Sequence, residues 1–127
     1  MKIAVIGAGS TYTPELINGF LDRADHLPVK EIYLMDIDQT RLQIVAGFVQ
    51  RLIAKAGSGI RIIQSLDAAE TINGADVVIT QLRDGQMVAR REDEYLGRKH
   101  ALVGLETTGI GGLSNALQTI PFLLAFW

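Results

Sequence analysis

The chain has no cysteine, only three prolines and 6% aromatic residues among its 127 residues. The absence of cysteine excludes a disulfide framework and a thiolate metal site, and it fits the reducing cytosol, so we expect a cytoplasmic protein. The formal net charge of −2 gives no bulk attraction to nucleic acid or to an anionic membrane. The start of the chain shows no signal-peptide pattern, and no apolar run reaches the roughly 20 residues of a membrane helix. We therefore expect no nucleic-acid partner and no membrane partner.

The longest apolar run, IPFLLAFW, stands at the end of the sequence. Because the end of a domain is normally solvated, an unbroken apolar run ending in Trp127 predicts a chain cut inside a helix. We expect residues 1–127 to form one N-terminal domain of a longer protein.

Short apolar runs alternate with helical patterns along the chain. Runs rich in β-branched residues predict strands at 2–7, 29–36, 60–65, 75–81 and, more briefly, at ALVG (101–104). Thr13, as the N-cap before Pro14 at the first helical position, predicts a helix that runs to about Ala24. Capping residues and apolar residues at helical spacing predict further helices over 38–57, 67–74 and 85–100, and from Leu113 onward. This alternation predicts an α/β fold, a Rossmann-like doubly wound parallel sheet with helices on both faces.

The stretch GAGSTY follows the first predicted strand and precedes the first helix. Gly7 at the turn tolerates an unusual φ, and Gly9 lets the backbone approach a pyrophosphate, which the helix N-terminus then attracts. Ser10 and Thr11 add amide and hydroxyl groups. Tyr12 stands in place of the third glycine of the dinucleotide fingerprint, so by itself the motif is a weak indicator.

Asp36, at the end of the second predicted strand, strengthens this interpretation. A carboxylate there accepts hydrogen bonds from both ribose hydroxyls and repels a 2′-phosphate, which favours NAD over NADP. It stands later than the usual spacing of about 20 residues, because the first helix and its loop are long. Arg41 either covers the adenine or binds a 2′-phosphate. The alternative role of Asp36 is to cap the following helix.

Two arginines follow the fourth predicted strand. Arg83 lies at its end and Arg90 lies two helical turns further on, so both can face a crevice at the carboxyl ends of the strands. Guanidinium groups there indicate an anionic substrate, a phosphate or a carboxylate. The alternative is a solvated helix face with ion pairs four residues apart. We adopt that alternative for the remaining charged residues of the stretch, Arg91, Glu92, Glu94, Arg98 and Lys99.

The stretch GLETTGIGG places the acid Glu106 among apolar residues and glycines, which makes it a candidate catalytic residue. The alternative is that this stretch only caps a helix, through Thr107, Thr108 or Ser114. The histidines, His26 and His100, have no second ligand at metal spacing, and we expect both at the surface.

The segments GAGSTYTPELINGF, LMDID followed by RL, ADVVITQLRDG, RREDE and GLETTGIGG occur in one order. Together they resemble the N-terminal part of glycoside hydrolase family 4, the NAD- and manganese-dependent 6-phospho-glycosidases and their α-glucosidase and α-galacturonidase relatives. The sequence ETTG, with its second threonine, resembles the 6-phospho-β-glucosidase branch more than the 6-phospho-α-glucosidase branch. In this family the GxGS motif is followed by threonine and an aromatic residue, so Tyr12 fits the pattern.

The resemblance implies roles for several residues. NAD would be bound by Gly7, Gly9, Ser10 and Asp36. Arg90 would bind the sugar phosphate, with Glu106 and Arg83 lining the active site.

The implied reaction on a phosphorylated disaccharide or aryl glycoside begins with NAD-mediated oxidation at C3 of the sugar. The ketone acidifies the C2 proton, a base removes it, and the aglycone leaves by elimination. Water then adds and the hydride returns. Mn²⁺ would act as a Lewis acid, with its ligands and the base tyrosine later in the chain. We therefore expect this chain to bind NAD weakly but not to hydrolyse a glycoside, and the full-length protein to be a homo-oligomer.

Two other functions stay open. A lactate or malate dehydrogenase-like NAD oxidoreductase shares the first strand, the acid after the second strand and ADVVI. This alternative predicts a loop rich in proline and arginine after the fourth strand. The stretch TQLRDGQMVARREDE at that place has no proline, which disfavours the alternative. The second is a non-catalytic nucleotide-binding module. A methyltransferase would leave ETTGIGG without a role.

Overall fold

The computed structural model describes residues 1–105 and 108–125. The chain divides into two compact units, Met1–Leu82 and Arg83–Trp127.

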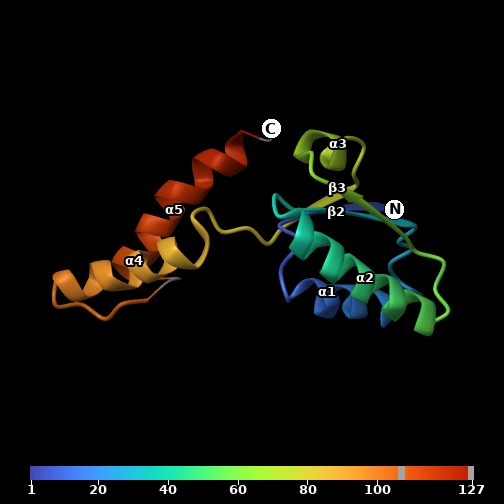
Figure 1. The fold of residues 1–127 in the computed structure, drawn as a ribbon, viewed down its shortest axis with the longest axis horizontal. Helices are drawn as coiled ribbons and strands as arrows, with labels where there is room; N and C mark the ends of the chain where they lie inside the picture. The colour runs from blue at the N-terminus through green and yellow to red at the C-terminus, as the bar shows by residue number, and fades with distance from the viewer. Residues whose placement is uncertain (106–107, 126–127) are drawn as a thin grey trace. The chain divides into compact units, whose positions relative to one another are not determined.

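The first unit is built on a parallel sheet (Figure 1). Within the described residues its strands are β1 (Lys2–Ile6), β2 (Glu31–Met35), β3 (Arg61–Ser65) and β4 (Val77–Thr80), in the order β3-β2-β1-β4. Helices α1 (Thr13–Leu21) and α2 (Gln39–Lys55) cover one face of the sheet, and α3 (Ala68–Ile72) covers the other. This arrangement confirms the predicted Rossmann-like fold class.

The central strand explains why the first apolar run is continuous. Ile3 of β1 pairs in register with Ile32 of β2 on one side and with Val77 of β4 on the other. Because helices cover both faces, four successive residues of β1 from Ile3 to Ile6 are buried. Each large aliphatic side chain buried in this way contributes about 1.5–3 kcal/mol to folding. Helix α2 adds a stripe of buried residues, Leu42, Ala46, Val49 and Ile53.

The helix starts in the first unit agree with the sequence except at α1. Asp38 caps α2, its side chain accepting a hydrogen bond from the Arg41 amide at 3.0 Å. Asp67 caps α3 in the same way. At α1 the N-cap is Tyr12, not Thr13. The helix also ends at Leu21, three residues before the predicted end.

The second unit contains α4 (Gln86–Lys99) and α5 (Gly109–Leu124), which pack against each other. The strand predicted at 101–104 is wrong. Ala101 has a φ of 55°, and the segment runs as a loop against α4. A Cβ on Gly97 would lie 3.0 Å from the Gly104 Cα, so both glycines are needed for this close approach. Helix α5 begins four residues earlier than predicted, inside the glycine-rich stretch.

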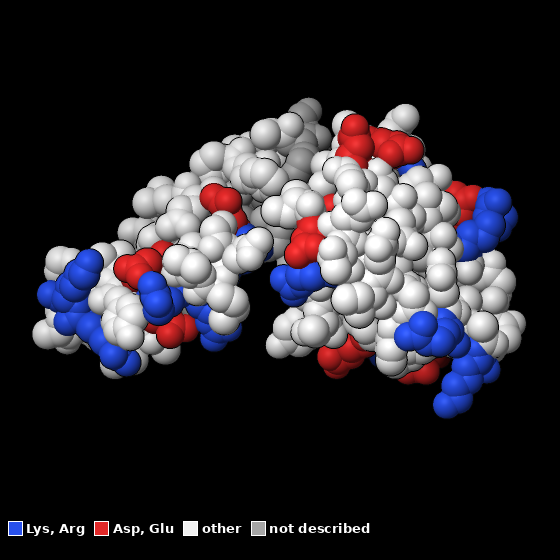
Figure 2. All heavy atoms as spheres, viewed as in Figure 1, with Lys and Arg blue, Asp and Glu red and all other residues white. Residues whose placement is uncertain are grey.

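The faces in view in Figure 2 show acidic and basic side chains interspersed on each unit. No helix in the described part of the chain is long and apolar enough to cross a membrane.

Candidate functional site

The glycine loop lies at the carboxyl end of β1. The amides of Gly7 and Ala8 both donate to the carbonyl of Met35, at 2.9 and 2.8 Å, so the loop bends toward the end of β2. Gly7 has a φ of +86°, and a Cβ there would lie 2.8 Å from backbone atoms of Gln81 and Leu82. Only glycine satisfies both the conformation and the close approach of the chain leaving β4.

Gly9, Asp36 and Arg41 meet at one point of this loop. The Gly9 amide donates to Oδ2 of Asp36 at 2.7 Å, and the Asp38 amide donates to Oδ1 at 2.9 Å. A Cβ on Gly9 would lie 2.7 Å from that same Oδ2 and 3.2 Å from the Arg41 Cβ. Both oxygens of the carboxylate are therefore oriented by backbone amides. Asp38, rather than Asp36, provides the side-chain cap of α2.

Ser10 and Thr11 continue the loop toward α1. The Ser10 amide donates to the Gly7 carbonyl at 3.1 Å, and the Ser10 hydroxyl accepts from the Tyr12 amide at 3.2 Å. Thr11 and Tyr12 are exposed. The tyrosine that replaces the third glycine thus points into solvent, where it does not crowd β1.

Thr13 has a role that sequence reasoning missed. It is completely buried, and its hydroxyl donates to the Ala8 carbonyl at 2.9 Å and lies 3.4 Å from Oε1 of Gln81. One side chain therefore connects the glycine loop to the end of β4. A buried threonine hydroxyl requires a partner, but the sequence does not show which one.

Arg83 and Arg90 both belong to the second unit. Nη1 of Arg83 lies 3.4 Å from Oδ2 of Asp93, and this aspartate is 2% exposed. Nε of Arg90 donates to Glu94 at 3.0 Å, the spacing expected for a solvated helix face. Arg83 is therefore held by a buried acid and Arg90 by a half-exposed one.

Three further predictions concern the catalytic acid, the histidines and the metal. Glu106 lies outside the described residues. His26 and His100 are exposed, as predicted. Among residues 1–105 and 108–125, no three Asp, Glu or His side chains gather closely enough to hold a metal ion.

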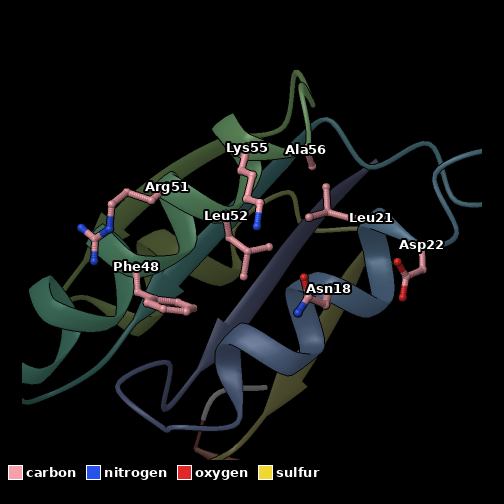
Figure 3. Close-up of a pocket in the computed structure, with 8 residues that line it drawn as sticks. All are labelled: Asn18, Leu21, Asp22, Phe48, Arg51, Leu52, Lys55 and Ala56. Carbon is pink, nitrogen blue, oxygen red and sulfur yellow. The ribbon is translucent and has the colours of Figure 1, made fainter.

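A cavity of about 560 Å³ lies between the C-terminal halves of α1 and α2 (Figure 3). Its lining residues are Asn18, Leu21, Asp22, Phe48, Arg51, Leu52, Lys55 and Ala56. The glycine loop precedes the opposite, N-terminal end of α1. None of the predicted site residues lines this cavity, so it is not the predicted nucleotide site.

Comparison with known proteins gives a consistent result. The model of the family described as Family 4 glycosyl hydrolase matches residues 2–126. The chain is 45% identical over 126 residues to a probable 6-phospho-beta-glucosidase of Bacillus subtilis and 43% identical over 125 residues to a 6-phospho-beta-glucosidase of Escherichia coli. These matches cover 98% and 97% of this chain but only 28% of each relative.

Solved structures agree with the sequence relatives. A 6-phospho-beta glucosidase from Thermotoga maritima, determined with manganese, NAD+ and glucose-6-phosphate, matches with a TM-score of 0.91 at 39% identity. The match covers 99% of this chain and 30% of that one. A malate dehydrogenase from Salinibacter ruber, at a TM-score of 0.51 and 24% identity over 78% of this chain, shares the fold alone.

Proposed function

Because the chain belongs to family 4 of the glycosyl hydrolases, we propose that residues 1–127 are the N-terminal NAD-binding part of a 6-phospho-β-glucosidase. The relatives at 45% and 43% identity bear that activity in their names. This chain spans 28% of their length, so the proposal places the rest of the catalytic machinery in a longer protein.

The arrangement of Gly9 and Asp36 is the observation that carries the NAD assignment. The 2.7 Å hydrogen bond from the Gly9 amide holds the carboxylate beside the glycine loop, where a Cβ would fill the space. A carboxylate with two amide donors still has lone pairs for the ribose hydroxyls. Its negative charge disfavours the 2′-phosphate of NADP. The site residues therefore fit a dinucleotide of the NAD type.

The other residues of the loop have complementary roles in this proposal. Gly7 lets the backbone pass close to the pyrophosphate, and Ser10 and Thr11 offer amide and hydroxyl groups at the N-terminus of α1. Arg41 covers the adenine. NAD, when bound, supplies a hydride acceptor for oxidation at C3 of the sugar. The protein's task in this part of the chain is to bind and orient.

Manganese does not fit the described residues, because no group of three possible ligands exists among them. The proposal therefore assigns the metal ligands to residues outside the described part. Arg83 and Arg90 are proposed to bind the anionic substrate, since a guanidinium presents a fork of donors to a phosphate. Glu106 is proposed to line the catalytic site.

We also propose that the full-length enzyme is cytoplasmic and homo-oligomeric. The absence of cysteine in this chain fits a reducing compartment. The oligomeric state follows from the family resemblance.

The deciding experiment uses the full-length enzyme and an aryl 6-phospho-β-glucoside. Aglycone release is measured with NAD and Mn²⁺ together, with each alone, and with neither. Release that requires both supports the proposal. Formation of NADH from a 2-hydroxy acid, with no release from either the β- or the α-anomer, would assign the chain to the dehydrogenases instead.

A further inference from the structure

Asp93 is the one buried acid among the described residues, and it lies in the second unit. It stands on the third turn of α4 and is 2% exposed. Its two oxygens have different partners. Oδ2 lies 3.4 Å from Nη1 of Arg83, which precedes α4, and Oδ1 lies 3.4 Å from Nε2 of Gln118 on α5. A single carboxylate therefore joins the segment after β4 to both helices.

The backbone around Asp93 is closely packed, which fixes where the carboxylate lies. A Cβ on Gly111 of α5 would lie 2.9 Å from the carbonyl oxygen of Asp93 and closer still to the carbonyl of Leu105. The Gln118 carboxamide also lies 3.2 Å from the Ser114 hydroxyl, which fixes its orientation. The acid is therefore held at the crossing of α4 and α5.

A buried carboxylate destabilises the fold unless it has a partner. An apolar residue of similar size would fill the crossing between the helices at less cost. The ion pair with Arg83 explains why an acid stands at this position. An ion pair with a buried carboxylate restricts the positions that the Arg83 guanidinium can take, and with them the directions in which its remaining N–H donors point.

We propose that Asp93 is a positioning residue for substrate binding, acting through Arg83. The carboxylate orients the guanidinium toward the anionic sugar, and Gln118 orients the carboxylate. This inference rests on the proposed function, because it needs Arg83 to contact the phosphorylated substrate. Sequence reasoning assigned Asp93 no role, since it lies among the charged residues of an otherwise solvated helix.

The test uses the full-length enzyme with Asp93→Asn, which keeps the size of the side chain and removes its charge. Loss of the charge that orients Arg83 weakens its bond to the substrate phosphate, so we expect the KM for the 6-phospho-glucoside to rise about tenfold or more. We expect kcat within about threefold of wild type and an unchanged Kd for NAD, because the lost interaction affects substrate binding.

The matched control is Glu92→Gln, on the adjacent residue of the same helix. The Glu92 side chain is 59% exposed and pairs with the exposed Arg91, so its loss should leave KM unchanged. A double-mutant cycle tests whether Asp93 affects substrate binding through Arg83. Because Asp93 acts through Arg83, the double variant Arg83→Gln/Asp93→Asn should be no worse than Arg83→Gln alone.

Several outcomes would overturn the inference. These are an unchanged KM in folded Asp93→Asn, additive effects in the double-mutant cycle, or an equal loss in Glu92→Gln. If Asp93→Asn melts too early to assay, Asp93→Glu keeps the charge but displaces it by one methylene. It should show the same rise in KM at constant kcat, and an unchanged KM there also overturns the inference. If the wild-type enzyme does not hydrolyse 6-phospho-glucosides at all, the proposed function itself is wrong. An active wild-type enzyme with an unchanged KM in Asp93→Asn contradicts only the role of Asp93.

Discussion

Replacing Gly9 with alanine tests the nucleotide site at its centre. The new Cβ would lie 2.7 Å from Oδ2 and 3.0 Å from Cγ of Asp36, closer than a methyl group and a carboxylate can approach. The obstructing atoms belong to a side chain, so Asp36 can rotate away while the backbone stays in place. At Gly7, by contrast, the obstructing atoms belong to the backbone of Gln81 and Leu82. The Gly9→Ala chain should therefore fold with its carboxylate misplaced.

The magnitude follows from the interactions that are lost. The Gly9 amide to Asp36 hydrogen bond has a charged acceptor, and such a bond is worth about 1.5–3 kcal/mol. If the displaced carboxylate no longer reaches the ribose, NAD binding loses a comparable amount. A loss of about 2 kcal/mol corresponds to an approximately 30-fold higher Kd. Isothermal titration calorimetry with NAD measures this change, and a thermal unfolding curve measures the accompanying change in stability.

Gly19→Ala is the matched control. Gly19 lies in α1, the helix that follows the loop, and a Cβ there meets nothing within 4 Å. Alanine in an open helical position should stabilise the fold by up to about 1 kcal/mol and leave the Kd for NAD unchanged. Wild-type NAD affinity in a folded Gly9→Ala chain would show that the Gly9–Asp36 contact is not part of the nucleotide site.

Three further substitutions separate the roles of neighbouring residues. Asp36→Asn should reduce the preference for NAD over NADP, measured as the ratio of the two Kd values, because the neutral side chain no longer repels the 2′-phosphate; an unchanged ratio would contradict the ribose assignment. Thr13→Val keeps the shape but leaves the buried Ala8 carbonyl without its hydroxyl donor, so unfolding should become easier by about 1–3 kcal/mol in a denaturant titration. Asp38→Ala removes the cap of α2 and should cost about 1 kcal/mol of stability with little change in NAD affinity. A large loss of NAD binding in that variant would contradict the assignment of helix capping to Asp38 and of NAD binding to Asp36 as separate roles.

The first unit could be predicted well from its sequence because its strands are buried on both faces. A run such as that in β1 is then continuously apolar, and the caps Asp38 and Asp67 mark the helix starts locally. Thr13 was misassigned because its pattern is that of an N-cap. Its actual partners, Ala8 and Gln81, are tertiary contacts that local chemistry does not specify.

The second unit was predicted less well, and its glycines give the reason. Residues 101–104 are apolar like a short strand, yet Gly104 approaches the Glu94 carbonyl so closely that no side chain fits there. The predicted start of the last helix at Leu113 left Gly111 in a glycine-rich loop, but Gly111 lies inside α5 where the helix crosses Asp93. In both cases the glycine serves close packing between segments. Sequence alone does not distinguish this use from conformational freedom.

The two amides that share the Met35 carbonyl have a consequence for the kinetics of nucleotide binding. Gly7 and Ala8 donate to a residue of β2, so the start of the glycine loop is part of the hydrogen-bonding of the sheet. Their exchange with solvent deuterium should be slow without any nucleotide, since it requires opening of the sheet itself. A cradle that is already ordered imposes little entropic cost on its ligand. Association should then follow a single phase whose rate rises linearly with NAD concentration.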